Sequence, residues 1–390
     1  MRKIAVVTTS RADYSHLYWV LRELDASDSI DLRLIVAGAH LSPAFGHTVR
    51  QIEADGFAIE AKLECLLSSD TDVGMAKTIG TATLSLADTL GAMRPDLLLL
   101  IADRYEMLAP AAAALALRIP VAHIEGGEVS EGAIDHAVRN ALTAMAHVHL
   151  APHAAAVARL SAMGEEGWRI HQVGAPSLDH LRRSALPDRA TLERELGIAL
   201  DPAPVVVATH PVTVARDTTR EADALFGALR TVSQPVVFCF PNSDAGSHEI
   251  MERATAYCEG REDARLFVNL DPVVYWSLLQ HAAAMVGNSS SGIMEAPSLG
   301  LPVVNVGMRQ QGRERAANII DVEPDRKQIT AAIARALSDE FRRSLSGLEN
   351  PYGDGAAAAR IARILEQVPL GERLFVKHAV PIEVAPPTPA

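Results

Sequence analysis

The feature of this sequence that most constrains its fold is the alternation of short apolar runs with longer helical patterns along almost the whole chain. In the first half, the apolar runs predict β-strands at Ile4–Thr8, Leu32–Ala37, Leu97–Ile101, Val121–Ile124 and His147–Ala151. The segments between them predict helices, for example Tyr14–Leu24, Thr71–Leu90 and Glu106–Leu117. Because such alternation is typical of parallel strands joined by crossover helices, the pattern indicates an α/β fold.

The alternation is interrupted at Gly174-Ala175-Pro176 and then resumes. A polar stretch from about Arg182 to Asp201, with one short helix, leads to a second set of strands predicted at Val205–Thr209, Val236–Phe240, Arg265–Val268, Met285–Gly287 and Val303–Val306. We therefore predict two Rossmann-like αβα domains, residues 1–180 and 181–355, which suits a chain of 390 residues. The helix near Ala356–Val368 fits either domain, and the tail 371–390, proline-rich from Pro381, is expected to be flexible.

The charge and the cysteines limit the partners of the chain. Its formal net charge is −12 at pH 7, which argues against a nucleic-acid-binding surface, because such a surface must neutralise phosphates. An anionic ligand must therefore be bound by a few local cations and backbone donors. Three distant cysteines fit a reduced cytosol and lack metal-ligand spacing. With no signal-peptide pattern and no apolar run near the roughly 18 residues of a membrane span, we expect a cytoplasmic protein.

One short segment, Gly287-Asn288-Ser289-Ser290-Ser291-Gly292-Ile293-Met294-Glu295, reads as the end of a buried strand, a turn of small residues and the start of a helix. The first N–H groups of a helix have no intrahelical partner and carry the positive end of its dipole, so this turn suits a phosphate. Glu295, about one helical turn later, would accept hydrogen bonds from a neighbouring sugar hydroxyl. A plain serine N-cap is the alternative interpretation.

Acidic residues follow two of the predicted strands of the first domain. Asp103 lies just beyond Leu97–Ile101, and Glu125 lies just beyond Val121–Ile124. Ligands of parallel sheets bind at the carboxyl ends of the strands, so both carboxylates are expected at one cleft, with Asp135 near the same rim. Such acids can divide general-acid and general-base work. The alternative is surface acids or helix caps, and for Asp135 a helical pair with Arg139.

Cationic residues follow other strands at the same edge. Arg11, after the first strand, can offer a guanidinium to a phosphate or sugar, but its segment lacks the Gly-x-Gly-x-x-Gly spacing of a nicotinamide-binding fingerprint. His210 follows the first strand of the second domain, and Arg309 and Arg313 follow the last predicted strand. A single histidine or arginine in a loop is usually just solvated, so it is the shared location that indicates an anion site.

Seven motifs, in order along residues 1–370, together resemble the hydrolysing UDP-N-acetylglucosamine 2-epimerases. They are Arg11-Ala12-Asp13-Tyr14-Ser15, Asp103-Arg104-Tyr105-Glu106, His123-Ile124-Glu125-Gly126-Gly127, His210-Pro211-Val212-Thr213, Pro241-Asn242-Ser243-Asp244-Ala245-Gly246, Asn288-Ser289-Ser290-Ser291-Gly292 and Arg309-Gln310-Gln311-Gly312-Arg313-Glu314. The resemblance implies a fold like that of the GT-B glycosyltransferases, with the active site in the cleft between two domains. It also implies that the helix at about 356–370 returns to the first domain and that the protein forms a homo-oligomer, a dimer or tetramer.

The resemblance further implies loss of UDP and inversion at C2 through a glycal, giving N-acetylmannosamine for sialic-type nonulosonic acid synthesis, without a metal or redox cofactor. Asp103, Glu125 and Asp135 would be the catalytic acids. The residues that would bind the nucleotide sugar are Arg11, Ser15, His210, Asn242, Ser289, Ser290, Gly292, Glu295 and Arg313.

The loop that carries the third acid departs from the family pattern. Many relatives have a Gly-x-Ile-Asp-Asp run, whereas this chain has Gly132-Ala133-Ile134-Asp135-His136 with Glu131 lengthening the loop before it. His136 or Glu131 could therefore share the task of Asp135. The substrate also stays open, because relatives act on UDP-2,4-diacetamido-2,4,6-trideoxyglucose or GDP-N-acetylglucosamine in the legionaminic acid route. A non-hydrolysing epimerase, a glycosyltransferase and a nucleotide-sugar sensor are the remaining alternatives.

Overall fold

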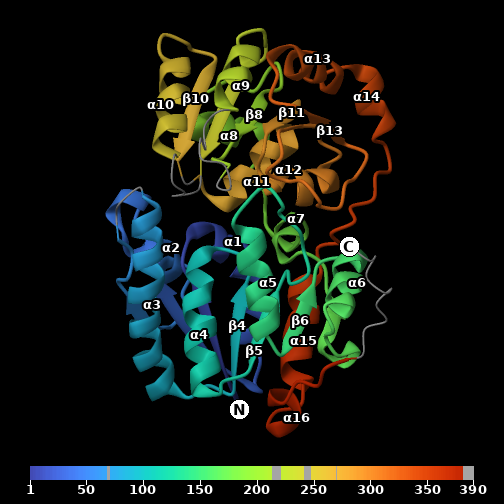
Figure 1. The fold of residues 1–390 in the computed structure, drawn as a ribbon. Helices are drawn as coiled ribbons and strands as arrows, with labels where there is room; N and C mark the ends of the chain where they lie inside the picture. The colour runs from blue at the N-terminus through green and yellow to red at the C-terminus, as the bar shows by residue number, and fades with distance from the viewer. Residues whose placement is uncertain (68–70, 213–220, 241–246, 269, 381–390) are drawn as a thin grey trace, which may run out of the picture.

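The computed structural model describes residues 1–67, 71–212, 221–240, 247–268 and 270–380, and this part of the chain forms two parallel sheets, one in each half (Figure 1). The strands of the first sheet, in spatial order, are β3 (Ile59–Leu63), β2 (Ile30–Ala37), β1 (Arg2–Thr8), β4 (Leu97–Ile101), β5 (Val121–Ile124), β6 (Val148–Ala151) and β7 (Ile170–Gln172). Those of the second are β10 (Ala264–Val268), β9 (Val236–Phe240), β8 (Val205–Ala208), β11 (Ala284–Gly287), β12 (Val303–Val306) and β13 (Ile319–Val322). The predicted two-domain α/β fold is confirmed.

Helices connect the strands in both halves. The helices of the first are α1 (Arg11–Asp25), α2 (Val49–Ala54), α3 (Asp72–Met93), α4 (Leu108–Leu117), α5 (Asp135–Met145), α6 (Ala154–Ala162) and α7 (Asp179–Arg183). Those that follow are α8 (Arg189–Leu196), α9 (Ala222–Leu229), α10 (Ser247–Cys258), α11 (Pro272–His281), α12 (Ser290–Met294), α13 (Arg326–Ala336), α14 (Asp339–Ser344), α15 (Ala357–Gln367) and α16 (Glu372–Phe375). None of the described helices is long and apolar enough to cross a bilayer.

The central strands explain why the apolar runs are visible in the sequence. Every residue of β4 and β5 is buried, since helices cover both faces of the sheet. Three strands were not predicted, β3, β7 and β13, and all three lie at sheet edges with partly exposed residues. A further difference concerns the predicted helix Glu106–Leu117, which begins as a short 3-10 turn before α4.

The last part of the chain returns from the second half to the first (Figure 1). Ile361 and Leu365 on α15 belong to the same core as β1 and α1. The N-terminus of α15 is capped from the first half, since both carboxylate oxygens of Asp179 accept hydrogen bonds from the N–H groups of Ala357 and Ala358 at 2.9 Å. The return holds the two halves together through a second crossing of the chain.

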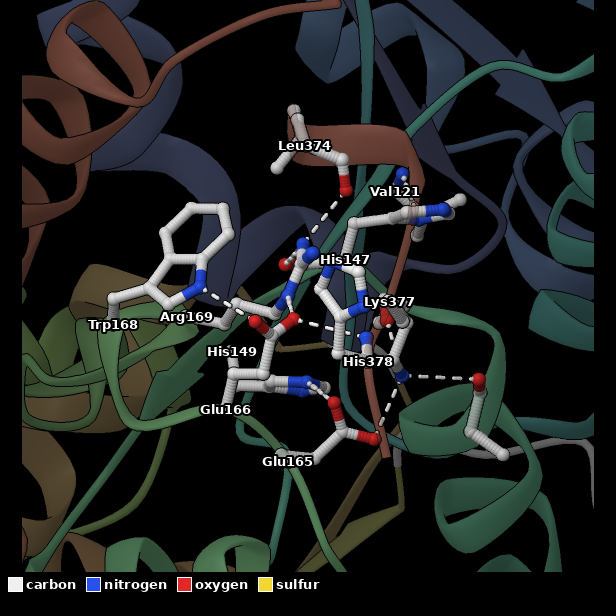
Figure 2. Close-up of polar contacts among 12 residues, drawn as sticks. Val121, His147, His149, Glu165, Glu166, Trp168, Arg169, Leu374, Lys377 and His378 are labelled. Carbon is white, nitrogen blue, oxygen red and sulfur yellow. Dashed lines mark hydrogen bonds and ion pairs between the residues drawn. The ribbon is translucent and has the colours of Figure 1, made fainter. Parts of the chain in front are cut away.

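A buried polar cluster fastens the segment after α15 (Figure 2). The guanidinium of Arg169 is fully buried and donates to the carbonyl oxygens of His147, Leu374 and Val376. Lys377 forms an ion pair with Glu165 at 2.7 Å. Because Arg169 satisfies carbonyl groups of two distant segments at once, the segment around Leu374 is attached by more than apolar contact.

Candidate active site

The three predicted catalytic acids line one cavity between the two halves of the molecule. Asp103, Glu125 and Asp135 reach it from the ends of β4 and β5 and from the start of α5. The same cavity is lined by four arginines from both halves: Arg104, Arg139, Arg309 and Arg313. The acidic chain thus places four cations beside its acids at one site, which agrees with the expectation that an anionic ligand is bound by a few local cations.

The backbone at the ends of β4 and β5 has an unusual conformation. Ala102 and Glu125, neither of them glycine, have φ values of 57° and 65°, in the left-handed region. Such conformations cost about 1–3 kcal/mol each and cluster at functional sites. The turn at Ala102 is held from the neighbouring strand, because the Nε2 of His123 lies 2.7 Å from the carbonyl oxygen of Ala102. These turns fix the directions of the adjacent Asp103 and Glu125 carboxylates.

Asp103 is held as a carboxylate by a buried arginine. The Nη2 of Arg139, whose side chain is 0% exposed, donates a short hydrogen bond to Oδ2 of Asp103. Burial favours the neutral acid, but the charges of Arg139, Arg313 and Arg309 outweigh it and keep the pKa of Asp103 below its ordinary value. The spacing of Arg139 in the sequence also suits a helical pair with Asp135. The structure instead directs it to Asp103 and, at 3.3 Å, to the carbonyl oxygen of Glu125.

Glu125 has a different kind of partner. Its Oε1 lies 3.3 Å from Nδ1 of His16, on α1. Burial again favours the neutral acid, and the hydrogen bond and charge of His16, with Arg139 and Arg313, lower the pKa of Glu125 below its ordinary value. Asp103 is therefore paired with a guanidinium, which is always charged, whereas Glu125 is paired with an imidazole, which can lose its proton.

Asp135 is the most exposed of the three acids. Its side chain is 26% exposed, and its Oδ2 lies 4.0 Å from Nη2 of Arg309 in the other half. His136 and Glu131, which could share the task of Asp135, do not line the cavity. The ring of His136 accepts a hydrogen bond from the N–H of Ser130, and the N–H of Glu131 donates to Gln311. The geometry therefore favours Asp135 over either neighbour.

A second cavity adjoins the first and collects most of the residues predicted to bind the nucleotide. It is lined by Arg11, Ser15, His210, Ser289, Ser290 and Glu295, with Tyr275 and Arg309. The Nε and Nη1 of Arg11 are buried and have no hydrogen-bond partner among the described residues. Since buried charged donors are almost always paired, these two N–H groups indicate an anionic ligand in this cavity.

The serine turn forms one wall of the second cavity. Ser289 is the N-cap of α12, and its side chain accepts a hydrogen bond from the N–H of Ser291, so the capping interpretation is correct, and binding of a phosphate stays a prediction. Asn288 joins the turn to the loop after β8, since its side chain accepts from the N–H of His210 and donates to the His210 carbonyl oxygen. Burial lowers the pKa of His210 well below its ordinary value, so its ring is neutral.

Three predicted binding residues stand apart from this wall. Gly292 does not line either cavity; a Cβ there would lie 2.8 Å from Cγ1 of Val303, so the glycine allows α12 to pack on β12. Arg313 lines the first cavity (the acid cavity), where its Nη2 donates to the Ser130 hydroxyl, and it does not line the second. Asn242 lies outside the described residues.

Two residues with central positions were not predicted as site residues. Arg139 was noticed only through its spacing from Asp135, and His16 was not singled out at all. A helical residue of α1 five positions after Arg11 gives no sign in the sequence that it meets Glu125. Within the described residues, no group of three His, Cys, Asp or Glu side chains could hold a metal ion.

Comparison with known proteins gives consistent results. Residues 22–366 match the family model described as UDP-N-acetylglucosamine 2-epimerase. The chain is 36% identical to the UDP-N,N'-diacetylbacillosamine 2-epimerase (hydrolyzing) of Legionella pneumophila, over 97% of this chain and 99% of that one. It is 34% identical to the GDP/UDP-N,N'-diacetylbacillosamine 2-epimerase (hydrolyzing) of Campylobacter jejuni, over 88% and 89%. The structure of S. aureus MnaA with UDP superposes with a TM-score of 0.79 at 18% identity, over 94% and 96% of the two chains.

Proposed function

Because the chain belongs to the UDP-N-acetylglucosamine 2-epimerase family and is a 2-epimerase of the hydrolysing type, we propose that its substrate is UDP-N,N'-diacetylbacillosamine, which is UDP-2,4-diacetamido-2,4,6-trideoxyglucose. The products would be UDP and the free sugar inverted at C2, a precursor of a sialic-type nonulosonic acid. The observation that carries the proposal is the pair of adjoining cavities, one lined by three acids and the other by unpartnered donors for an anion.

The two cavities suit the two halves of such a substrate. The diphosphate would bind Arg11, the serine turn and His210, and the ribose would donate hydrogen bonds to Glu295. The sugar would lie in the acid cavity, where Ala12, Ala133 and Met294 add apolar surface. That surface suits a sugar with a C6 methyl group and two acetamido methyl groups, because the burial of apolar groups away from water is favourable.

The chemistry explains why more than one acid is needed. The C2 hydrogen is not acidic, so cleavage of the C1–O bond must run ahead and positive charge develops at C1. Carboxylates beside C1 and C2 stabilise that charge, and one of them removes the C2 proton to leave a glycal. Water then adds at C1 while a proton reaches C2 from the opposite face. Asp103 and Glu125, which lie at one edge of the sheet, would make these two transfers, with Asp135 at the rim.

UDP-N-acetylglucosamine is the second candidate substrate, favoured by the description of the family model. The experiment is NMR analysis of products in D2O with UDP-N,N'-diacetylbacillosamine, UDP-N-acetylglucosamine and GDP-N-acetylglucosamine. We expect the first to react with the highest kcat/KM and to give UDP and a free sugar with mannose configuration and deuterium at C2. Preference for either of the other two would contradict the substrate assignment, and a product that keeps its C2 hydrogen would contradict the glycal.

The assembly and location of the protein also belong to the proposal. The family resemblance supports a homo-oligomer and a cytoplasmic enzyme. Sedimentation of the purified chain at micromolar concentration tests the first, and a monomer there would contradict it. Fractionation of the producing cells tests the second.

A further inference from the structure

His16 connects the two cavities. It is the residue of α1 that lines both of them, together with Ala12. Its Nδ1 lies 3.3 Å from Oε1 of Glu125, at the end of β5, and its Nε2 lies 3.7 Å from Oε1 of Glu295, after α12. The imidazole therefore stands between a catalytic carboxylate of one half and the carboxylate proposed to bind the ribose in the other.

The surroundings of His16 favour a proton on its ring. Burial disfavours the imidazolium, but the hydrogen bond to Glu125 and the negative charges of Glu125, Glu295 and Asp13 outweigh burial and raise the pKa of His16 to about 9. His180 on α7 also faces it, and burial lowers the pKa of His180 to about 4, so that ring is neutral. The charged side chains that share the first cavity with His16 also include Asp103, Asp135, Arg104, Arg139, Arg309 and Arg313. The imidazolium form of His16 thus predominates at neutral pH, with Nδ1 next to Glu125.

Asp103 lacks such a proton source. Its partner is Arg139, and a guanidinium keeps its protons at any physiological pH. Of the two deep carboxylates, Glu125 is the one whose partner can release a proton. The two acids are thereby suited to different steps: a carboxylate that stays ionised can accept the C2 proton, and a carboxylate beside an imidazolium can deliver one.

On the basis of the proposed function, we propose that His16 is a positioning residue. It supplies, through Glu125, the proton that is delivered to C2 of the glycal. Asp103 removes the C2 proton of the substrate. In the first step the C2–H electron pair becomes the C1=C2 bond, the C1–O pair leaves with UDP, and the proton goes to Asp103. In the second step, Glu125 receives a proton from His16 and passes it to C2, where the C1=C2 electron pair forms the new C–H bond. The oxygen of water binds C1. The proton released by that water restores the imidazolium, and Asp103 loses its proton to solvent.

The position of Glu295 links this transfer to the nucleotide. When ribose hydroxyls donate to Glu295, its negative charge is shared with them and its attraction for His16 weakens. This lowers the pKa of His16, so its proton is given up to Glu125 more readily, as the second step requires. Binding of the nucleotide in the second cavity therefore makes His16 a better proton donor to Glu125 in the first.

The test measures three products of the same reaction: UDP, free glycal and epimerised sugar. His16→Gln keeps a polar side chain that can contact Glu125 but has no titratable proton. Since general-acid catalysis contributes about 100-fold or more, we expect the ratio of glycal to epimerised sugar to rise about 100-fold while UDP release falls much less. His16→Lys restores a proton and is expected to bring the ratio back toward that of the unmodified enzyme. The matched control is His47→Gln, at a half-buried histidine whose Nδ1 lies 3.1 Å from the Leu41 carbonyl oxygen, outside both cavities.

The pH profile gives an independent measurement. Because the pKa of His16 is raised to about 9, its proton is present below that pH and lost above it, so the glycal fraction of the unmodified enzyme should increase above about pH 9. Equal losses of UDP release and epimerised sugar in His16→Gln, with no glycal and no change in the profile, would overturn the assignment and leave His16 a structural role. An unmodified enzyme that releases no UDP from any tested nucleotide sugar would instead overturn the proposed function, and this inference with it.

Discussion

Gly132 lies in the loop that leads to Asp135 (the acid loop), where the first half of the molecule contacts the second. Its replacement tests whether the two halves must approach this closely during catalysis. The glycine is buried in the loop that leads to Asp135. A Cβ at this position would lie 2.4 Å from the carbonyl oxygen of Met308 and 2.5 Å from Cα of Arg309. Both are backbone atoms, so no flexible side chain can move aside. Gly132→Ala can be accommodated only if the loop and the segment at Met308 separate.

The size of the effect follows from the separation needed. Moving a contact from 2.4 Å to an ordinary one requires about 1 Å of displacement, and overpacking of this kind costs about 1–3 kcal/mol. Because Gly132 and Met308 belong to different halves, the cost falls on the closed form of the cleft and not on either core. A coupling of 1–3 kcal/mol corresponds to about 5- to 150-fold, so we expect kcat/KM for UDP release to fall by that factor.

The assay compares kcat/KM of Gly132→Ala with that of Gly80→Ala at equal protein concentration. Gly80 lies in α3, where an added Cβ would have nothing within 4 Å, so alanine there should keep kcat/KM unchanged and favour the helix by about 1 kcal/mol. Denaturant unfolding of Gly132→Ala should stay close to that of the unmodified protein. A Gly132→Ala enzyme with unchanged kcat/KM would show that the acid loop and Met308 do not approach this closely during turnover, and the reasoning would fail.

Three further changes test other parts of the structure. Asp103→Asn removes the proposed base and should lower UDP release about 100-fold or more, measured together with loss of deuterium incorporation at C2 in D2O; unchanged labelling would contradict the role. Arg139→Met removes the cation that lowers the pKa of Asp103, so the pKa should rise and the acidic limb of the kcat/KM profile should move to higher pH, whereas an unmoved limb would place the ionisation elsewhere. Arg169→Met removes the donor to the buried carbonyl oxygens of His147 and Leu374 and to the carbonyl oxygen of the exposed Val376, and it should lower the free energy of unfolding by about 3 kcal/mol in a urea titration, while the exposed Arg159→Met should not; equal values would contradict the cluster in Figure 2.

Burial decides which strands the sequence could reveal. The central strands β4, β5, β9 and β12 were predicted to the residue, because a strand covered on both faces is mostly apolar. β3 has the sequence Ile-Glu-Ala-Lys-Leu, in which every second residue is exposed, and β7 has only three residues at the opposite edge. Edge strands are half solvated, so their short mixed patterns look like those of loops.

The acids of the site could be located from the sequence because strand ends specify an edge of the sheet. The partners of those acids could not, because a helix pattern gives spacing along one helix and not what its residues face. Arg139 is four residues after Asp135 on α5 and still binds Asp103, which follows β4 and is distant in the sequence. His16 lies on α1 as one more polar residue of an amphipathic helix, and its contact with Glu125 exists only once β1 and β5 are in the same sheet.

The two halves of the molecule contribute different groups to the site, which explains why this reaction would take place in a cleft between them. The proposed acids come from the first half, whereas the serine turn, His210 and Glu295 come from the second. The C1–O bond to be broken would therefore lie across the boundary, with the sugar held on one side and the diphosphate mainly on the other. Arg313 crosses that boundary to Ser130, whose hydroxyl lies 3.4 Å from Asp103, so closure also completes the charge around Asp103. We expect the cleft to open for product release. Opening would separate the two products and move Arg309 and Arg313 away from Asp103, which would make this carboxylate easier to protonate and interrupt its proposed role as a base.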